Sequence, residues 1–163
     1  MKLAVISDIH DNLVNLEKAL NWAKANDIGE IICAGDVTNS ETLQFMADNF
    51  SGTIHLVRGN MEIYEEAEAK KLYNINYLGR FGATEITGKI VGVCHEPLFI
   101  DDVLAKGKPE IIFFGHTHKP WMEKKDGVTT ANPGTLGGVF QKATFAVWDS
   151  ETGFLELKLL ETL

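Results

Sequence analysis

Strand-like runs that end in polar motifs dominate this sequence and restrict the folds open to it. The runs occupy residues 3–6, 31–34, 54–57, 84–93 and 111–114. The polar residues that follow them are Asp8 and His10, Asp36, Asn60, His95, and His116 and His118. Short apolar runs of this kind are typical of buried strands. Because ligand crevices form at the carboxyl ends of strands in α/β sheets, motifs that are far apart in sequence are predicted to meet in one crevice.

Helix-like segments separate the first strand-like runs. Apolar residues recur at helical spacing at Leu13, Leu16, Leu20 and Ala23. Asp11 or Asn12, directly before them, can cap this helix. Three further helices are predicted, after Ser40, over residues 62–71 and over residues 98–106.

Hairpins are predicted in the second half of the chain. Residues 84–93 read as two strands joined at a glycine-containing turn, and two more hairpins are predicted around 125–127 and 150–153. Together the segments predict a mixed α/β architecture in which two sheets pack face to face with helices outside. The length of the chain fits a single domain, residues 1–163.

Bulk properties exclude several classes of protein. The formal net charge of −8 argues against binding to a nucleic-acid duplex, which needs a basic face. The first apolar run reaches Asp8 too soon for a signal peptide, and no stretch approaches the roughly 20 apolar residues of a membrane span. Cys33 and Cys94 lack CxxC spacing. These features predict a cytoplasmic protein with free thiols and no membrane segment.

The polar motifs form a coherent set of metal ligands. Two carboxylates, four imidazoles and one amide oxygen, without thiolates, suit divalent ions such as Mn²⁺, Fe²⁺ or Zn²⁺. A glycine directly precedes three of the residues, at Gly35, Gly59 and Gly115. Each glycine can provide the tight turn or the close backbone approach that directs a ligand inward.

Each motif by itself has a simpler explanation, as a helix cap, a turn or a pair of surface histidines. The combination favours a metal centre because four of the five histidines lie in these motifs. His55 is the fifth, and because it lies inside a strand-like run we interpret it as structural.

The series Asp8-x-His10, Gly35-Asp36, Gly59-Asn60, His95 and Gly115-His116-x-His118 resembles the calcineurin-like metallophosphoesterases. Within them it is most similar to the small single-domain branch of bacterial and archaeal phosphodiesterases. The resemblance extends to the turn Asn132-Pro133-Gly134-Thr135. It implies a four-layer α-β-β-α sandwich with two mixed sheets and a dinuclear centre at one edge. One metal would be held by Asp8, His10, Asp36 and His118, and the other by Asp36, Asn60, His95 and His116.

The resemblance also implies a reaction. A hydroxide that bridges two divalent ions would attack phosphorus in line and hydrolyse a phosphodiester. Mn²⁺ is the first choice of metal, with Fe²⁺, Zn²⁺, Ni²⁺ and Mg²⁺ as alternatives. Two ions outweigh the two carboxylates and the hydroxide in charge, so an acidic protein can bind a small phosphate ester.

One position departs from the pattern of many larger relatives, which carry a histidine after the Gly-Asn pair that is thought to protonate the leaving group. Met61 occupies this position and cannot donate a proton. General-acid catalysis contributes typically 10²–10⁴-fold. We therefore predict activity on activated esters such as aryl phosphodiesters and weaker activity on alkyl monoesters. Glu62 is either a substitute acid or an exposed first-turn residue of a helix.

Asn12 is a second open assignment, because it can either bind a phosphoryl oxygen or only cap the following helix. Two alternative functions also remain. One is a phosphomonoesterase or nucleotide phosphatase of the same fold. The other is a non-catalytic metal-binding scaffold for protein interactions, the role of a retromer subunit that this fold resembles. A homo-oligomer is compatible with each of these functions.

Overall fold

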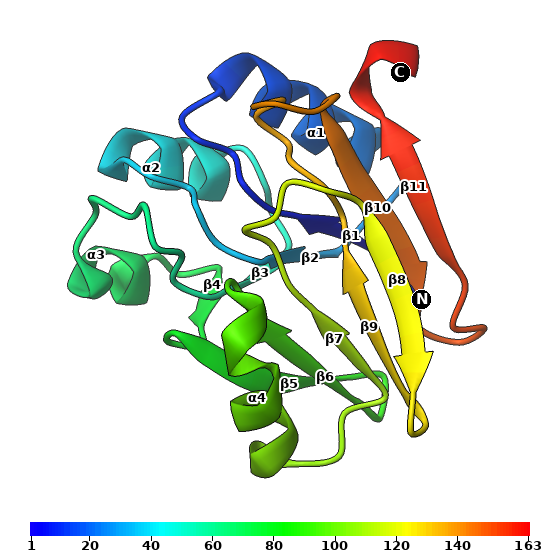
Figure 1. The fold of residues 1–163 in the computed structure, drawn as a ribbon. Helices are drawn as coiled ribbons and strands as arrows, with labels where there is room; N and C mark the ends of the chain where they lie inside the picture. Colours follow the sequence, from blue (N-terminus) through cyan, green and yellow to red (C-terminus); the bar gives the residue numbers. More distant parts are fainter.

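Two mixed β-sheets packed face to face form the centre of the protein, in a computed structural model that describes residues 1–163 (Figure 1). The first sheet has the strand order β11-β10-β1-β2-β3-β4, and the second has the order β5-β6-β7-β9-β8. The strands of the first sheet are β1 (Lys2–Ile6), β2 (Glu30–Cys33), β3 (Thr53–Leu56), β4 (Ile75–Tyr77), β10 (Thr144–Asp149) and β11 (Leu155–Leu159). Those of the second are β5 (Phe81–Ile86), β6 (Lys89–Cys94), β7 (Ile111–Phe113), β8 (Trp121–Lys125) and β9 (Val128–Asn132).

Each sheet has a parallel centre, and antiparallel strands form one edge of the first sheet and both edges of the second. Strands β1, β2, β3 and β4 are parallel, and β10 and β11 extend their sheet in antiparallel fashion. In the other sheet β6, β7 and β9 are parallel, whereas β5 and β8 are antiparallel edge strands. The central strands of each sheet run in one direction. Their carboxyl ends therefore lie at the same end of that sheet, as the sequence predicted.

Helices form the outer two of the four layers. The helices α1 (Leu13–Ala25), α2 (Ser40–Asp48) and α3 (Glu66–Lys71) pack on the first sheet, and α4 (Ile100–Lys106) packs on the second (Figure 1). Short 3₁₀ turns cover Pro97–Phe99 and Leu160–Thr162. The predicted four-layer α-β-β-α sandwich with two mixed sheets is confirmed.

The alternation of side chains along β1 explains why the apolar runs are continuous. Leu3 and Val5 belong to the core between the two sheets, whereas Ala4 and Ile6 pack toward the helices. Both faces of the strand are buried, so neither face requires polar residues. The helical spacing in α1 has the same cause, since Leu16 and Leu20 lie on its buried face.

The predicted helix over residues 62–71 is wrong at its start. The helix begins at Glu66, after a capping box in which the backbone N–H of Glu65 donates to the Glu68 side chain. The preceding residues form a turn and irregular chain, in which the backbone N–H groups of Ile63 and Tyr64 donate to the carbonyl oxygen of Thr38. This link to the loop after β2 overrides the local helical preference. The three predicted hairpins are confirmed as β5–β6, β8–β9 and β10–β11.

The core between the sheets gives a stability test. Phe113 on β7 is fully buried, and its ring packs edge-on against Trp148 of the opposite sheet, with 5.9 Å between the ring centroids. We expect Phe113→Ala to lower the free energy of unfolding by about 3–5 kcal/mol, because the cavity would open between two rigid sheets. Urea denaturation measures the change. Phe154→Ala is the control, since this side chain is 65% exposed, and it should change stability by less than about 0.5 kcal/mol.

Candidate metal centre

The polar motifs meet at one edge of the sandwich. Asp8 Oδ1 lies 3.2 Å from His118 Nε2 and 3.7 Å from His10 Nε2, and the two histidine nitrogens are 3.2 Å apart. The loops after β1 and β7 therefore combine to form a group of three candidate ligands, although His118 follows His10 by 108 residues.

A second group lies beside the first. Asp36 Oδ2 is 3.3 Å from His95 Nε2, and His95 Nε2 is 2.9 Å from the side-chain oxygen of Asn60. The same Asn60 oxygen lies 3.0 Å from His116 Nδ1. Asp36 Oδ2 is also 3.7 Å from His10 Nε2, so this carboxylate lies between the two groups. The structure thus brings together all seven residues that the sequence selected.

The backbone at this edge is strained. Asp8, His10, Asp36, His116 and His118 have positive φ angles between 47° and 68°, so five of the seven candidate ligands are in the left-handed region. Such a conformation costs of order 1–3 kcal/mol for a residue other than glycine and is concentrated at functional sites. The same five side chains contribute to the two groups of candidate ligands.

Two glycines are required because the ligands lie directly against them. A Cβ atom on Gly59 would lie 2.1 Å from Asp36 Oδ1, and one on Gly115 would lie 2.0 Å from Ser7 Oγ and 2.8 Å from Asp8 Oδ2. These separations are shorter than van der Waals contact. Of the two roles predicted for these glycines, close backbone approach is the one that applies.

Hydrogen bonds orient two of the imidazoles. His95 Nδ1 donates to the carbonyl oxygen of Ala34 at 2.7 Å, and His118 Nδ1 donates to the carbonyl oxygen of Val139 at 3.1 Å. A carbonyl oxygen only accepts, so in the neutral rings the lone pair is on Nε2, which faces the carboxylates. A carbonyl partner on the outer nitrogen is the usual support for a metal-binding histidine. The clustered nitrogen and oxygen acceptors fit borderline to hard divalent ions.

Burial and charge set the protonation of the centre. Burial opposes ionisation of Asp36, but the hydrogen bond to His95 and the Met61 N–H hold the pKa of this carboxyl below its ordinary value. Burial also disfavours the charged form of His95, yet Asp36 and Asp8 raise the pKa of its imidazole. Interaction with Asp8, followed by the charge of Asp36, raises the pKa of His10. The carboxylates therefore create a negative potential that attracts protons and metal ions alike.

Sequence reasoning missed three residues that brace the ligand loops. The Asn132 amide donates to the carbonyl oxygen of Gly115 at 2.8 Å, and the Thr135 hydroxyl donates to that of Asp8 at 3.0 Å. Asp11 accepts from the backbone N–H of Asn39 and from other groups near the start of α2. The signal was available for Asn132 and Thr135, because the sequence marked their turn as shared with the small phosphodiesterase branch. No sequence pattern pointed to the role of Asp11.

Glu62 is also part of this support. Its carboxylate accepts the backbone N–H groups of Val37 at 3.2 Å, Thr38 at 2.7 Å and Gly59 at 3.2 Å. Burial raises the pKa of Glu62, although these N–H donors oppose the shift. The interpretation as an exposed first-turn residue is wrong, because α3 begins four residues later. The carboxylate faces backbone donors and does not line the cleft.

Asn12 lies next to the centre with its amide already bonded. Its oxygen accepts the backbone N–H of Asn15 at 3.1 Å, which caps α1, and its nitrogen donates to the carbonyl oxygen of Gly137 at 3.0 Å. His55 is outside the cluster and hydrogen-bonds to Glu30 and Asn76 on the neighbouring strands. Cys33 and Cys94 are buried free thiols.

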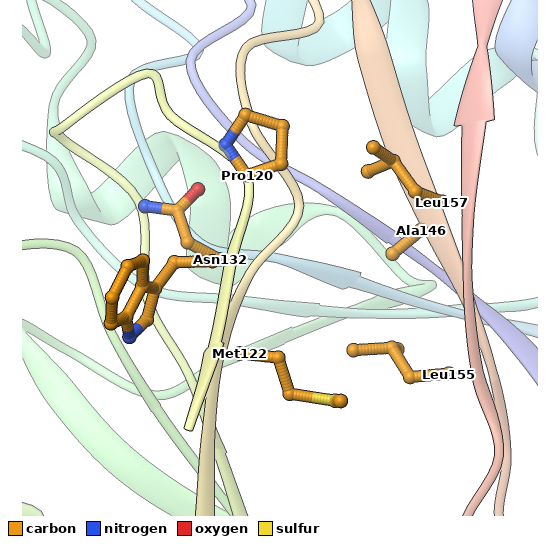
Figure 2. A pocket seen from close by; sticks show the side chains of 7 residues that line it. Pro120, Met122, Asn132, Ala146, Leu155 and Leu157 are labelled. Atoms are coloured by element: carbon orange, nitrogen blue, oxygen red, sulfur yellow. The ribbon is translucent and has the colours of Figure 1, made fainter.

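A cleft of about 520 Å³ opens over the polar cluster. Its ten lining residues are His10, Asp36, Asn60, Met61, His116, Thr117, His118, Val139, Phe140 and Gln141. A second hollow of about 250 Å³ lies elsewhere, between the edge strands β8 and β11, and is lined by groups such as Met122, Leu155 and Leu157 (Figure 2). Trp121 borders this second hollow. None of its lining side chains is ionisable, so the chemistry belongs to the cleft over the cluster.

Comparison with known proteins agrees with this fold. The sequence model of the calcineurin-like phosphoesterase superfamily domain matches residues 1–153. The phosphodiesterase MJ0936 of Methanocaldococcus jannaschii is 25% identical over 158 residues, which cover 93% of this chain and 94% of that protein. Vacuolar protein sorting-associated protein 29 of Schizosaccharomyces pombe is 28% identical over 142 residues, or 85% of this chain and 73% of that one.

Solved structures show the same fold. An archaeal phosphodiesterase superposes with a TM-score of 0.87 at 23% identity, covering 98% of this chain and 99% of its own. The phosphoesterase Yfce of E. coli superposes with a TM-score of 0.73 at 19% identity, covering 98% of this chain and 100% of its own. The chain belongs to the calcineurin-like phosphoesterase superfamily. None of its helices combines the length and the apolar character that a membrane span requires.

The role of Glu62 as a support can be tested by removing its charge. We expect Glu62→Gln to lower the free energy of unfolding by about 1–3 kcal/mol, because an amide NH₂ would face backbone donors in place of a carboxylate oxygen. We also expect Mn²⁺ affinity to fall about 10–100-fold, because the loops that carry Asp36 and Asn60 would lose their link. Denaturation and calorimetric titration measure the two effects. Glu66→Gln, on the exposed start of α3, should change neither.

The raised pKa values of His10 and His95 predict a pH-dependent affinity for metal. Both rings keep a proton to a higher pH than free imidazole, and a divalent ion has to displace it. Mn²⁺ affinity should therefore fall as the pH is lowered toward the ordinary imidazole pKa of about 6.5 and below it, by up to about tenfold per pH unit for each proton released. Without metal the sign is opposite, because these protonated rings stabilise the fold at low pH and lose that contribution as the pH rises. Titrations in buffers of different ionisation enthalpy count the protons, and a constant affinity over this range would contradict the prediction.

Proposed function

We propose that this protein is a phosphodiesterase that uses two divalent metal ions. The observation that carries the proposal is the position of Asp36, whose Oδ2 atom lies between His10 on one side and His95 on the other. A carboxylate between two groups of ligands is the arrangement that a bridging ligand needs. The phosphodiesterase relative MJ0936, which matches nearly the whole chain, supports the same activity.

The seven residues of the cluster would hold the ions. We assign Asp8, His10, Asp36 and His118 to one ion and Asp36, Asn60, His95 and His116 to the other, with Mn²⁺ as the preferred metal because all donors are oxygen or imidazole nitrogen. Two bound ions would supply an activated water nucleophile and positive charge for the phosphoryl oxygens. The protein fixes the ligands in advance through the strained loops and their hydrogen bonds, so that little reorganisation is needed.

The cleft explains why a good leaving group is expected. Its ionisable lining residues are His10, Asp36, His116 and His118, and all four belong to the proposed ligand set. Met61 has no proton to donate, and the Glu62 carboxylate faces away from the cleft toward backbone N–H groups. With no free acid in the lining, the leaving oxygen has to depart without protonation by a side chain. Aryl diesters meet this condition, whereas alkyl monoesters do not.

A non-catalytic scaffold is the second candidate function. The specific observation in its favour is the similarity to vacuolar protein sorting-associated protein 29 over 85% of this chain. A scaffold can still bind metal, so metal content does not distinguish the two functions. The complete set of candidate ligands, braced on several sides, favours the enzyme. We further infer a single domain, residues 1–163, in the cytoplasm, with a small phosphate ester as its substrate.

Relative rates on two substrates test the proposal. With added Mn²⁺ we expect hydrolysis of an aryl phosphodiester to be much faster than hydrolysis of a sugar phosphate, because only the aryl oxygen leaves readily as an anion. His116→Ala should reduce the rate on the aryl diester by at least about 10²-fold while it leaves the fold intact, because its side chain is exposed at the edge of the cluster.

His55→Gln is a suitable control, since this histidine lies outside the cluster and Gln can keep a polar contact to Glu30. Its rate should stay close to that of the wild type. Faster cleavage of the sugar phosphate would assign the protein to the phosphomonoesterases. Absence of turnover on every ester with metal bound would favour the scaffold.

A further inference from the structure

Phe140 is the most exposed large apolar side chain in the protein. It is 93% exposed, and it adopts a φ angle of 61°. A left-handed backbone is a genuine outlier for a bulky aromatic residue, and burial of the ring would stabilise the fold. The chain thus accepts backbone strain and an exposed ring at the same residue.

The exposure of this ring does not result from a loose chain end. The preceding segment is tied to the metal centre, since Gly137 N–H donates to the carbonyl oxygen of Asp8 at 2.9 Å and Asn12 donates to the carbonyl oxygen of Gly137 at 3.0 Å. His118 Nδ1 donates to the carbonyl oxygen of Val139, the residue directly before Phe140. The ring of Phe140 lies nearly parallel to that of His118, with an angle of 26° and a centroid distance of 6.3 Å. It is therefore held at the edge of the candidate metal site.

The rest of the cleft lining shows what kind of group fits beside this ring. Met61 also lines the cleft and is 54% exposed, and Val139 adds a third apolar side chain. No lysine or arginine is among the ten lining residues. The cleft therefore lacks a lysine or arginine that would bind a second phosphate, and its volume of about 520 Å³ is that of a site for a whole small molecule.

We propose that Phe140 and Met61 form a binding site for an uncharged aromatic ester group of the substrate. The aromatic ring of an aryl or nucleoside ester would stack on Phe140 and contact the flexible thioether of Met61, while its phosphoryl group lies over the cluster of metal ligands. Stacked aromatic pairs and sulfur–aromatic contacts are both favourable. The inference deepens the proposed phosphodiesterase function and rests on it. It predicts a preference for diesters with one aromatic substituent over dialkyl esters and over substrates that carry additional phosphates.

Direct binding of two phosphonates tests the site without turnover. Phenylphosphonate and methylphosphonate carry the same phosphoryl oxygens and differ only in the substituent. By calorimetric titration, the Mn²⁺-loaded wild type should bind phenylphosphonate about 3- to 10-fold more tightly than methylphosphonate. Phe140→Ala should reduce this preference to less than about twofold, and Phe140→Tyr should keep it. Affinity for methylphosphonate should be the same in all three proteins, because the metal ligands are unchanged.

Phe154→Ala is the matched control, because it removes another exposed phenylalanine, from the turn between β10 and β11. It should retain the phenyl preference. The inference is overturned if the wild type binds both phosphonates equally or if Phe140→Ala keeps the preference. A change in oligomeric state on sedimentation of Phe140→Ala, with the preference intact, would instead assign the ring to a contact between protein chains.

The two proposals can fail separately. A phenyl preference that depends on Phe140, without hydrolysis of any diester, would support the aromatic site and refute the phosphodiesterase. Hydrolysis of an aryl diester without a phenyl preference would refute the aromatic site alone. Failure of the Mn²⁺-loaded protein both to bind either phosphonate and to hydrolyse any diester would refute both.

Discussion

The confinement of two carboxylates, Asp8 and Asp36, at the end of a closed sandwich is the constraint on which the rest of this structure depends. Both are almost fully buried, where an unpaired negative charge is very unfavourable. The molecule compensates with backbone N–H groups and with imidazoles, which also supply the remaining donor atoms of the proposed metal centre. The distribution of histidines, the strained loops and the glycines all follow from the need to surround these two groups.

The support of the centre is distributed over the whole chain. Glu62 links the loops that follow β2 and β3, Asn132 holds the loop that follows β7, and Thr135 holds the loop that follows β1. Each of these residues uses its side chain to satisfy backbone groups of a ligand loop. Rigid loops keep the ligands at a fixed separation, and this preorganisation is what an electrostatic mechanism of catalysis requires. The site of this chain therefore depends on more residues than the candidate ligands themselves.

The surface of the cleft determines which esters suit the centre. Every ionisable group in its lining belongs to the proposed ligand set, so the site offers charge stabilisation but no separate proton donor. An apolar rim made by Met61 and Phe140 takes the place that a charged specificity pocket would occupy. The proposed leaving-group chemistry and the proposed aromatic site thus favour the same class of substrate, although they arise from different residues.

Much of this protein followed from sequence because its central strands are buried on both faces and its candidate ligands come soon after them. Continuous apolar runs are a local signal, and the order of the polar motifs revealed the family, the mixed two-sheet fold and the candidate ligands. Tertiary structure alone decided the true start of α3, the bracing role of Glu62 and Asp11, and the position of Phe140 beside the cluster. Each of these depends on a contact between segments that are distant in the chain, and neither helical propensity nor residue spacing carries information about such contacts. The local sequence pattern was therefore sufficient to identify the candidate ligands, whereas tertiary packing decided their arrangement and the shape of the cleft above them.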